Sequence, residues 1–145
     1  MTTTWSITVD CAAPRVLAEF WKTALGYTDA PPPAGFESWP AWFLWCEVPE
    51  SEWDDGATIV DPDGLRPQLC FLVVPEPKRA KNRLHLDLKV SGGRAEPAEV
   101  RTRRIRSTVA ALTAAGARTL EEHRLHDELD HVVLADPEGN EFCVV

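Results

Sequence analysis

The stretch Ala135-Asp-Pro-Glu-Gly-Asn-Glu-Phe-Cys143 determines the predicted fold, because it joins a turn signal to a strand signal. Asp-Pro followed by Glu-Gly is typical of a tight turn, and the residues after it belong to a short, largely apolar strand. The same turn signal occurs 75 residues earlier as Asp61-Pro-Asp-Gly64. A turn used twice at this distance indicates an internal repeat.

The elements around the two turns recur in the same order. In each half a strand precedes a helix that ends at a glycine, Gly26 or Gly116, and further strands follow. Each half is therefore predicted to be a βαβββ module, with module one at residues 1–76 and module two at residues 83–145 of a single domain. The predicted helices are Pro14–Leu25 and Pro97–Ala115, and the predicted strands are Trp5–Cys11, Ala57–Val60, Gln68–Val74, Leu84–Val90, Arg118–Leu125, His131–Ala135 and Glu141–Val145.

Module one also contains an aromatic insert at residues 36–55. Ser38 is a typical helix cap, and apolar side chains follow it at the spacing of a buried helical stripe: Trp39, Trp42, Phe43 and Cys46. We expect this insert to form a wall or lid beside a binding site, where Trp39 and Trp42 offer stacking surface to a planar ligand.

The charge balance excludes several classes of partner. The chain has 145 residues, 15 of them basic and 23 acidic, which gives a net charge of −8. Such a chain repels nucleic-acid backbones and anionic membrane surfaces. No apolar run approaches the roughly 20 residues that span a bilayer, and the N-terminus lacks a secretory signal pattern. We therefore expect a cytoplasmic protein that binds neither nucleic acid nor membrane, in which Trp5 and Trp21 are buried.

Three segments resemble the vicinal-oxygen-chelate superfamily, which includes glyoxalase I, extradiol dioxygenases, fosfomycin-resistance enzymes and bleomycin-resistance proteins. They are Ala18–Tyr27, Arg83–Leu88 and Ala135–Cys143, and the sequence is most similar to a glyoxalase-like subgroup common in actinobacteria. The resemblance implies an α+β fold in which two βαβββ modules curl their sheets into a cup. It places the helices on the convex side and the ligand on the concave side, and it implies a homodimer.

Strand alternation assigns the candidate site residues to the concave side. Thr8 and Asp10 share one face of the first strand, and His85 and Asp87 share one face of the fifth. Asp10 and Asp87 could equally bond to nearby backbone or arginine, and His85 could be a hydrogen-bonded wall residue. The predicted ligand-binding residues are Thr8, Asp10, Trp39, Trp42, Gln68, Cys70, His85, Asp87 and Glu141.

The candidate catalytic residues are His85, Asp87 and Cys143. A neutral imidazole beside Asp87 could orient a substrate or act as general base. A thiolate at Cys143 is a further possibility, although the negative charge of Glu141 would oppose its formation.

The metal-dependent members of the superfamily place His or Gln on the first strand of each module and Glu on the last. The corresponding positions here are Thr8 (or Ser6), Gln68, His85 and Cys143, and only His85 is of the expected type. Because a catalytic zinc site normally has three protein ligands, no metal cofactor is expected. The alternative is Zn²⁺ or another divalent metal held by His85, Cys143 and Gln68.

His123, His126 and His131 lie among acidic residues where a strand meets a turn. Their spacing favours a solvated acidic loop over a metal site.

Together these features predict a glyoxalase-like protein that binds a small organic molecule in the cup. The tryptophans allow that molecule to be aromatic, and its fate would be sequestration or acid–base chemistry without metal. Two alternatives stay open: a metal-dependent lyase or isomerase of glyoxalase type, and a structural dimer without catalysis. Whether the chain is an enzyme is not decided by the sequence.

Overall fold

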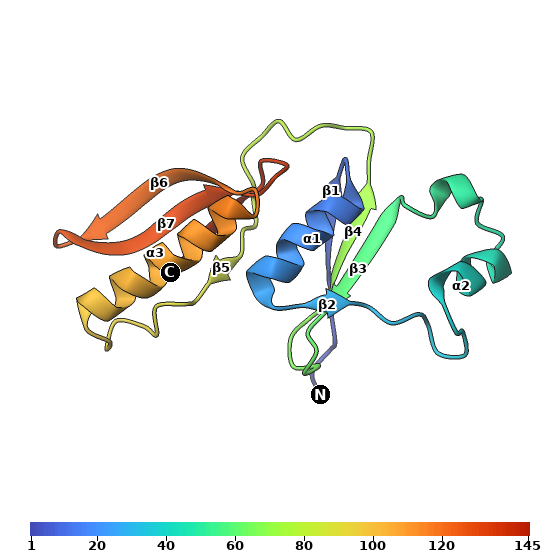
Figure 1. The fold of residues 1–145 in the computed structure, drawn as a ribbon, viewed down its shortest axis with the longest axis horizontal. Coiled ribbons are helices and arrows are strands. Elements are labelled where there is room, and N and C mark those ends of the chain that lie inside the picture. Colours follow the sequence, from blue (N-terminus) through green and yellow to red (C-terminus); the bar gives the residue numbers. More distant parts are fainter. The chain divides into compact units, whose positions relative to one another are not determined.

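The computed structural model describes residues 1–145, and it has the predicted α+β architecture (Figure 1). The chain divides into two compact units, Met1–Pro77 and Lys78–Val145. None of its helices combines the length and the apolar character needed to cross a bilayer.

The first unit contains one four-stranded mixed sheet. Its strands lie in the order β1-β4-β3-β2, with β1 parallel to β4 and the other pairs antiparallel. The aromatic insert lies between β2 and β3. The elements are β1 (Ile7–Cys11), α1 (Pro14–Leu25), β2 (Thr28–Asp29), α2 (Trp39–Trp45), the 3₁₀ helix η1 (Glu50–Glu52), β3 (Gly56–Val60) and β4 (Leu69–Val73).

The second unit repeats this topology. Its strands lie in the order β5-β8-β7-β6, with β5 parallel to β8, so each strand takes the place of its counterpart in the first unit. Both units are therefore βαβββ modules, as the duplicated turns predict. The elements are β5 (Asp87–Leu88), α3 (Ala98–Ala114), β6 (Arg118–Leu125), β7 (Glu128–Ala135) and β8 (Glu141–Val144).

Helix α1 begins and ends where its proline and glycine predict. Pro14 fits the first turn because its missing N–H has no intrahelical partner there, and Gly26 ends the helix with a left-handed φ of 70°. Leu17, Phe20 and Trp21 are buried, and the helix packs on β3 and β4. The expected burial of Trp21 is thus confirmed.

The two Asp-Pro turns share the same internal hydrogen bonding. The Asp61 carboxylate accepts from the N–H groups of Asp63, Leu65 and Arg66, and the Asp136 carboxylate accepts from Glu138 and Asn140. Both aspartates are buried. Each carboxylate satisfies the backbone donors of its turn, which explains why the same residue type stands at both positions.

Three expectations about burial and strand length are wrong. Trp5 is 64% exposed, because β1 begins only at Ile7 and no partner strand covers the residues before it. Val16, expected in the apolar stripe of α1, is also exposed. The predicted strand Leu84–Val90 shrinks to Asp87–Leu88, and Leu84 is 88% exposed. Its ladder with β8 begins at the Leu86 carbonyl, which accepts from Cys143 N.

The predicted loop between the strands Arg118–Leu125 and His131–Ala135 is shorter than expected. Strand β7 begins at Glu128, so only His126 and Asp127 form the turn and both have left-handed φ values, 49° and 64°. His123 and His131 consequently lie opposite each other in the β6–β7 hairpin.

Candidate functional site

The predicted site residues gather in two places, one in each unit. In the first unit Thr8, Cys70, Trp39 and Trp42 line one cavity. In the second unit the ligand atoms of His85, Asp87 and Cys143 lie within 4.8 Å of one another. The three remaining candidates, Asp10, Gln68 and Glu141, belong to neither group.

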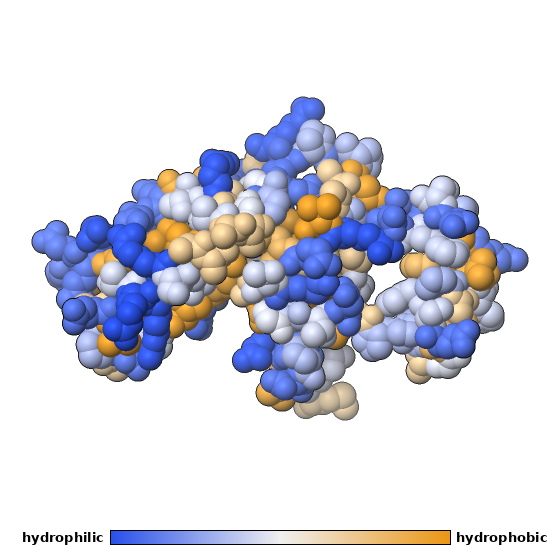
Figure 2. Space-filling model, in the orientation of Figure 1, coloured by the Kyte–Doolittle hydropathy of each residue, from blue (hydrophilic) through white to orange (hydrophobic).

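The cavity of the first unit has a volume of about 670 Å³. It is bounded by the insert on one side and by α1, β3 and β4 on the other, and Figure 2 shows the gap between the insert and the rest of the unit. Aromatic, polar and charged side chains line it: Trp39, Trp42, Phe43, Trp53, Thr8, Thr58, Cys70, Arg15, Glu19, Asp29 and Glu52.

The aromatic part of the lining is one connected cluster. The Trp39 ring meets that of Trp42 edge-on at 5.6 Å, and the Phe43 ring stacks on Trp53 at 5.6 Å. The indole N–H of Trp39 donates to a backbone carbonyl at 2.9 Å, and the indole N–H of Trp53 donates to another at 3.1 Å. Because these polar edges are satisfied inside the protein, the rings offer mainly their apolar faces to a ligand.

Helix α2 forms as predicted but is not buried as predicted. The Ser38 side chain accepts from Ala41 N at 3.2 Å and caps the helix. No residue of α2 is fully buried, and Trp45 is 71% exposed. The expected buried stripe of this seven-residue helix is therefore half-exposed beside the cavity.

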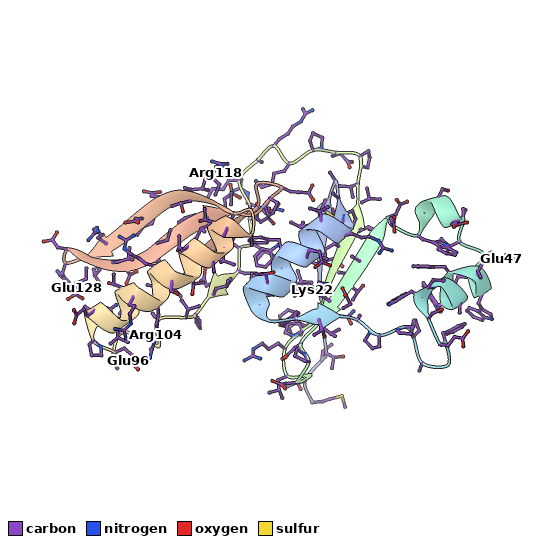
Figure 3. All side chains as sticks on the ribbon, viewed as in Figure 1. Lys22, Glu47, Glu96, Arg104, Arg118 and Glu128 are labelled. Carbon is purple, nitrogen blue, oxygen red and sulfur yellow. The ribbon has the colours of Figure 1, made fainter.

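Ion pairs fix two of the carboxylates at the cavity. Lys22 of α1 (labelled in Figure 3) contacts Glu19 at 2.7 Å and Asp29 at 2.9 Å. The hydrogen bonds to Glu19 and then Asp29 raise the pKa of Lys22. Arg15 pairs with Asp54. The polar side of the cavity therefore already has a network of paired charges.

Two sulfur contacts connect the lining to the predicted residues of β4. Thr58 Oγ1 lies 3.7 Å from Cys70 Sγ, and the Gln68 amide donates to the same sulfur at 3.5 Å. Gln68 thus acts on Cys70 and lies outside the lining itself. Sequence reasoning did not single out Thr58 or Trp53; the alternation around buried Ile59 was the available signal for Thr58, which lies on the opposite strand face.

In the second unit, strand register assembles the cluster of His85, Asp87 and Cys143. Asp87 pairs directly with Cys143 in the parallel β5–β8 ladder, and His85 lies two residues before Asp87. His85 Nδ1 is 3.0 Å from Asp87 Oδ1 and 4.0 Å from Cys143 Sγ. The imidazole can donate from Nδ1 to the carboxylate, which leaves Nε2 as the basic nitrogen.

The surroundings of Cys143 favour the thiol over the thiolate. Burial raises the pKa of Cys143, and the negative charge of Asp87 raises it further against the opposing charge of Lys81. Opposition to the thiolate was expected from Glu141, but Glu141 pairs instead with Lys78 at 3.2 Å and accepts from Asn82 N at 3.0 Å. Burial acts to raise the pKa of Glu141, yet these hydrogen bonds lower it overall.

The cluster supplies a donor that the sequence analysis did not count. One imidazole nitrogen, one carboxylate oxygen and one sulfur form a donor set that suits zinc, and three protein ligands are the usual number of a catalytic zinc site. Asp87 takes the third place, whereas Gln68, the expected third ligand, belongs to the first unit. The sequence analysis therefore undercounted the metal-binding potential of this cluster.

Comparison with known proteins gives a match over nearly the whole chain. The model of a family described as a glyoxalase-like domain matches residues 6–145. No curated protein matches the sequence.

Several solved structures share the fold. A glyoxalase/bleomycin resistance protein/dioxygenase family enzyme from Burkholderia phytofirmans PsJN has a TM-score of 0.59 at 13% identity, covering 96% of this chain and 94% of its own. Fosfomycin resistance protein FosX from Mesorhizobium loti has a TM-score of 0.62 at 6% identity, covering 99% and 90%. A FosX variant from Listeria monocytogenes, complexed with Mn(II) and 1S,2S-dihydroxypropylphosphonic acid, has a TM-score of 0.59 at 10% identity, covering 99% and 89%. At these identities the likeness shows the fold, and it gives no support for an actinobacterial subgroup.

Proposed function

The chain belongs to the glyoxalase-like domain family, and on this premise we propose that it binds a small organic molecule with a planar apolar part in the aromatic cavity of its first unit. One observation carries the proposal: four aromatic side chains that are only half-buried converge on a single cavity. They are Trp39, Trp42, Phe43 and Trp53.

The size of the cavity supports a small ligand. Small-molecule sites usually measure about 300–1,000 Å³ and combine apolar walls with a few polar groups. The volume of about 670 Å³ falls within this range. The polar groups here are the hydroxyls of Thr8 and Thr58 and the guanidinium of Arg15, which would orient the ligand.

The aromatic rings explain the preference for a planar ligand. An aromatic pair contributes about 0.5–1.5 kcal/mol beyond the area it buries, and a saturated ring of similar size cannot stack in the same way. Binding would also remove the half-exposed faces of Trp42 and Phe43 from water. Sequestration of the ligand needs no further chemistry.

A matched pair of probes tests this proposal: 2-naphthol, which is planar, and decahydro-2-naphthol, its saturated counterpart. We expect the planar probe to bind at least about tenfold more tightly by calorimetry, and Trp42→Ala to abolish the difference. Trp45→Ala is the control, because Trp45 is exposed and lies outside the cavity lining. Equal binding of the two probes, or equal loss in both variants, would contradict the proposal.

A second candidate function is a metal-dependent lyase or isomerase of glyoxalase type. The observation that favours it is the convergence of three donor atoms in the second unit. His85, Asp87 and Cys143 would hold the ion, which when bound polarises a carbonyl or lowers the pKa of bound water. A structural neighbour is complexed with Mn(II), but a sulfur donor favours Zn²⁺ over Mn²⁺ for this chain.

Metal analysis distinguishes the two functions. If this second function holds, the untagged protein contains about one zinc ion per chain at this cluster, and His85→Ala or Cys143→Ser removes it. The cavity variant Trp42→Ala retains the ion. A zinc content that is the same in both cluster variants as in the unsubstituted protein would refute the second function without affecting the first.

A further inference from the structure

The β6–β7 hairpin of the second unit brings together two histidines that the proposed function does not use. His123 and His131 are paired directly across the hairpin, and their rings stack at 4.4 Å with an angle of 10°. The left-handed turn at His126 and Asp127 pairs Leu125 with Glu128, and a register shift between His123 and Arg124 then places His123 opposite His131. Without that shift the partner of His123 would be Asp130, so no local sequence signal predicts the contact.

A carboxylate lies on the same strand face as this pair. Glu121 precedes His123 by two residues with no bulge between them, so both side chains project from one face of β6. Glu121 Oε2 lies 3.4 Å from His123 Nε2. Two imidazoles and one carboxylate thus share a small patch of the hairpin surface.

A second carboxylate orients the ring of His131. Asp130 Oδ2 lies 2.9 Å from His131 Nδ1, and Arg94 holds the other oxygen of Asp130 at 2.9 Å. A carboxylate has only acceptor atoms, so both His131 and Arg94 donate to Asp130. The proton of the neutral ring must therefore lie on Nδ1, which leaves the lone pair on Nε2.

A carboxylate that accepts a hydrogen bond from one ring nitrogen of a histidine is typical of histidines that bind metal ions through the other nitrogen. Ligand histidines almost always donate their second ring N–H to a carboxylate or carbonyl, which fixes the tautomer and raises the basicity of the ligating nitrogen. Both histidines are partly exposed, which gives an ion access from solvent.

From these contacts we propose that His123, His131 and Glu121 bind one divalent transition-metal ion such as Zn²⁺, with Asp130 holding His131 in place. The site is distinct from the cluster on β5 and β8, because β6 and β5 are the two opposite edges of the sheet. Binding requires the two stacked rings to rotate until one nitrogen of each points toward the ion. The bound ion would then bridge β6 and β7 and so stabilise the second unit.

Zn²⁺ titration tests the site in a background that removes the other cluster. His85→Ala/Asp87→Ala suits this purpose, since both side chains are exposed. In that background we expect one Zn²⁺ per chain by calorimetry and native mass spectrometry. Adding His131→Gln or His123→Gln should weaken binding by at least about tenfold, and Asp130→Asn by about 10–100-fold.

His126→Asn is the matched control, because this turn histidine lies outside the pair and asparagine tolerates its left-handed φ. It should leave Zn²⁺ affinity unchanged. A second measurement needs no substitution in the pair: substoichiometric Cu²⁺ should broaden the imidazole proton NMR signals of His123 and His131 before those of His126. Unchanged Zn²⁺ affinity in the His123→Gln/His131→Gln variant, or equal broadening of all three histidines, would overturn the proposal.

Discussion

At the scale of single residues, position in the strand register decides the chemistry of Cys143. Cys143 lies in β8, and the parallel pairing of this strand with β5 places the thiol beside the Asp87 carboxylate and 4.0 Å from His85 Nδ1. The sulfur therefore faces two polar groups while it remains buried.

Removing the charge of Asp87 should activate this thiol. Because burial and then Asp87 raise the pKa of Cys143, Asp87→Asn should lower that pKa and increase the fraction of thiolate at a given pH. We expect faster alkylation of Cys143 by iodoacetamide near pH 8, measured by peptide mapping. Exposed Cys46 is the internal control, and its rate should not change. An unchanged Cys143 rate would show that burial alone controls its reactivity.

Asp61 should make the protein sensitive to acid. Burial acts to raise the pKa of Asp61, but the Asp63 N–H and the Arg66 guanidinium together lower it below its ordinary value. A carboxyl group with a depressed pKa stabilises the folded state above the unfolded value of about 3.9, and this contribution disappears as pH falls through the folded pKa.

Urea midpoints between about pH 6 and pH 3 measure this effect. Asp61→Asn should lower the midpoint at pH 6 and should show a smaller further fall at pH 3 than the unsubstituted protein. Asp63→Asn, at an exposed position of the same turn, should follow the unsubstituted protein. Parallel pH curves for Asp61→Asn and the unsubstituted protein would contradict the assignment.

At the scale of elements, α1 and α2 represent two outcomes of the same apolar spacing. Helix α1 begins at Pro14 and ends at Gly26 as predicted, and α2 has its predicted cap at Ser38. Only α1, however, packs on the sheet of its unit. Helix α2 instead leaves its aromatic face beside a cavity. A helical period therefore predicts the side that is apolar, and the sheet decides whether that side is covered.

Substitutions at two neighbouring residues of α1 should show how strongly the stability of the protein depends on coverage by the sheet. Leu17 is fully buried, whereas Val16 is 63% exposed. Leu17→Ala should reduce the free energy of unfolding by about 2–5 kcal/mol, because it creates a cavity under the sheet. Val16→Ala should change it by less than about 0.5 kcal/mol. Urea unfolding measures both, and similar losses would mean that α1 is rotated relative to the structure described above.

At the scale of the whole molecule, the duplication gives two units with the same strand order but different side-chain chemistry. The first unit carries aromatic rings around a cavity, and the second carries clustered histidines, carboxylates and a thiol. Neither set has a counterpart in the other unit. The two βαβββ modules therefore share their topology and differ in their candidate site residues.

We propose a homodimer, as the family resemblance implies. Large apolar side chains exposed on both units, Leu65 and Leu84 among them, are compatible with a partner surface. Sedimentation equilibrium at two protein concentrations should give about twice the chain mass of 16.1 kDa. A single species at the chain mass at both concentrations would rule the dimer out.

The sequence by itself determined the features that depend on local signals. Pro14 and Gly26 delimit α1 correctly, the predicted strand Arg118–Leu125 matches β6, and the paired Asp-Pro turns reveal the repeat. Caps, turns and periodicity act over a few residues, so they can be read from the chain directly.

Only the tertiary structure decided which faces of the helices and strands contact one another. Strand register placed Asp87 beside Cys143 and His123 against His131. The lack of a partner strand before Ile7 exposed Trp5, and β5 is only two residues long. Packing left the tryptophans of α2 half-exposed around a cavity. These outcomes depend on contacts between residues far apart in sequence, where a shift by one residue exchanges the two faces of a strand. The candidate residues could therefore be named from the sequence, but their partners could not.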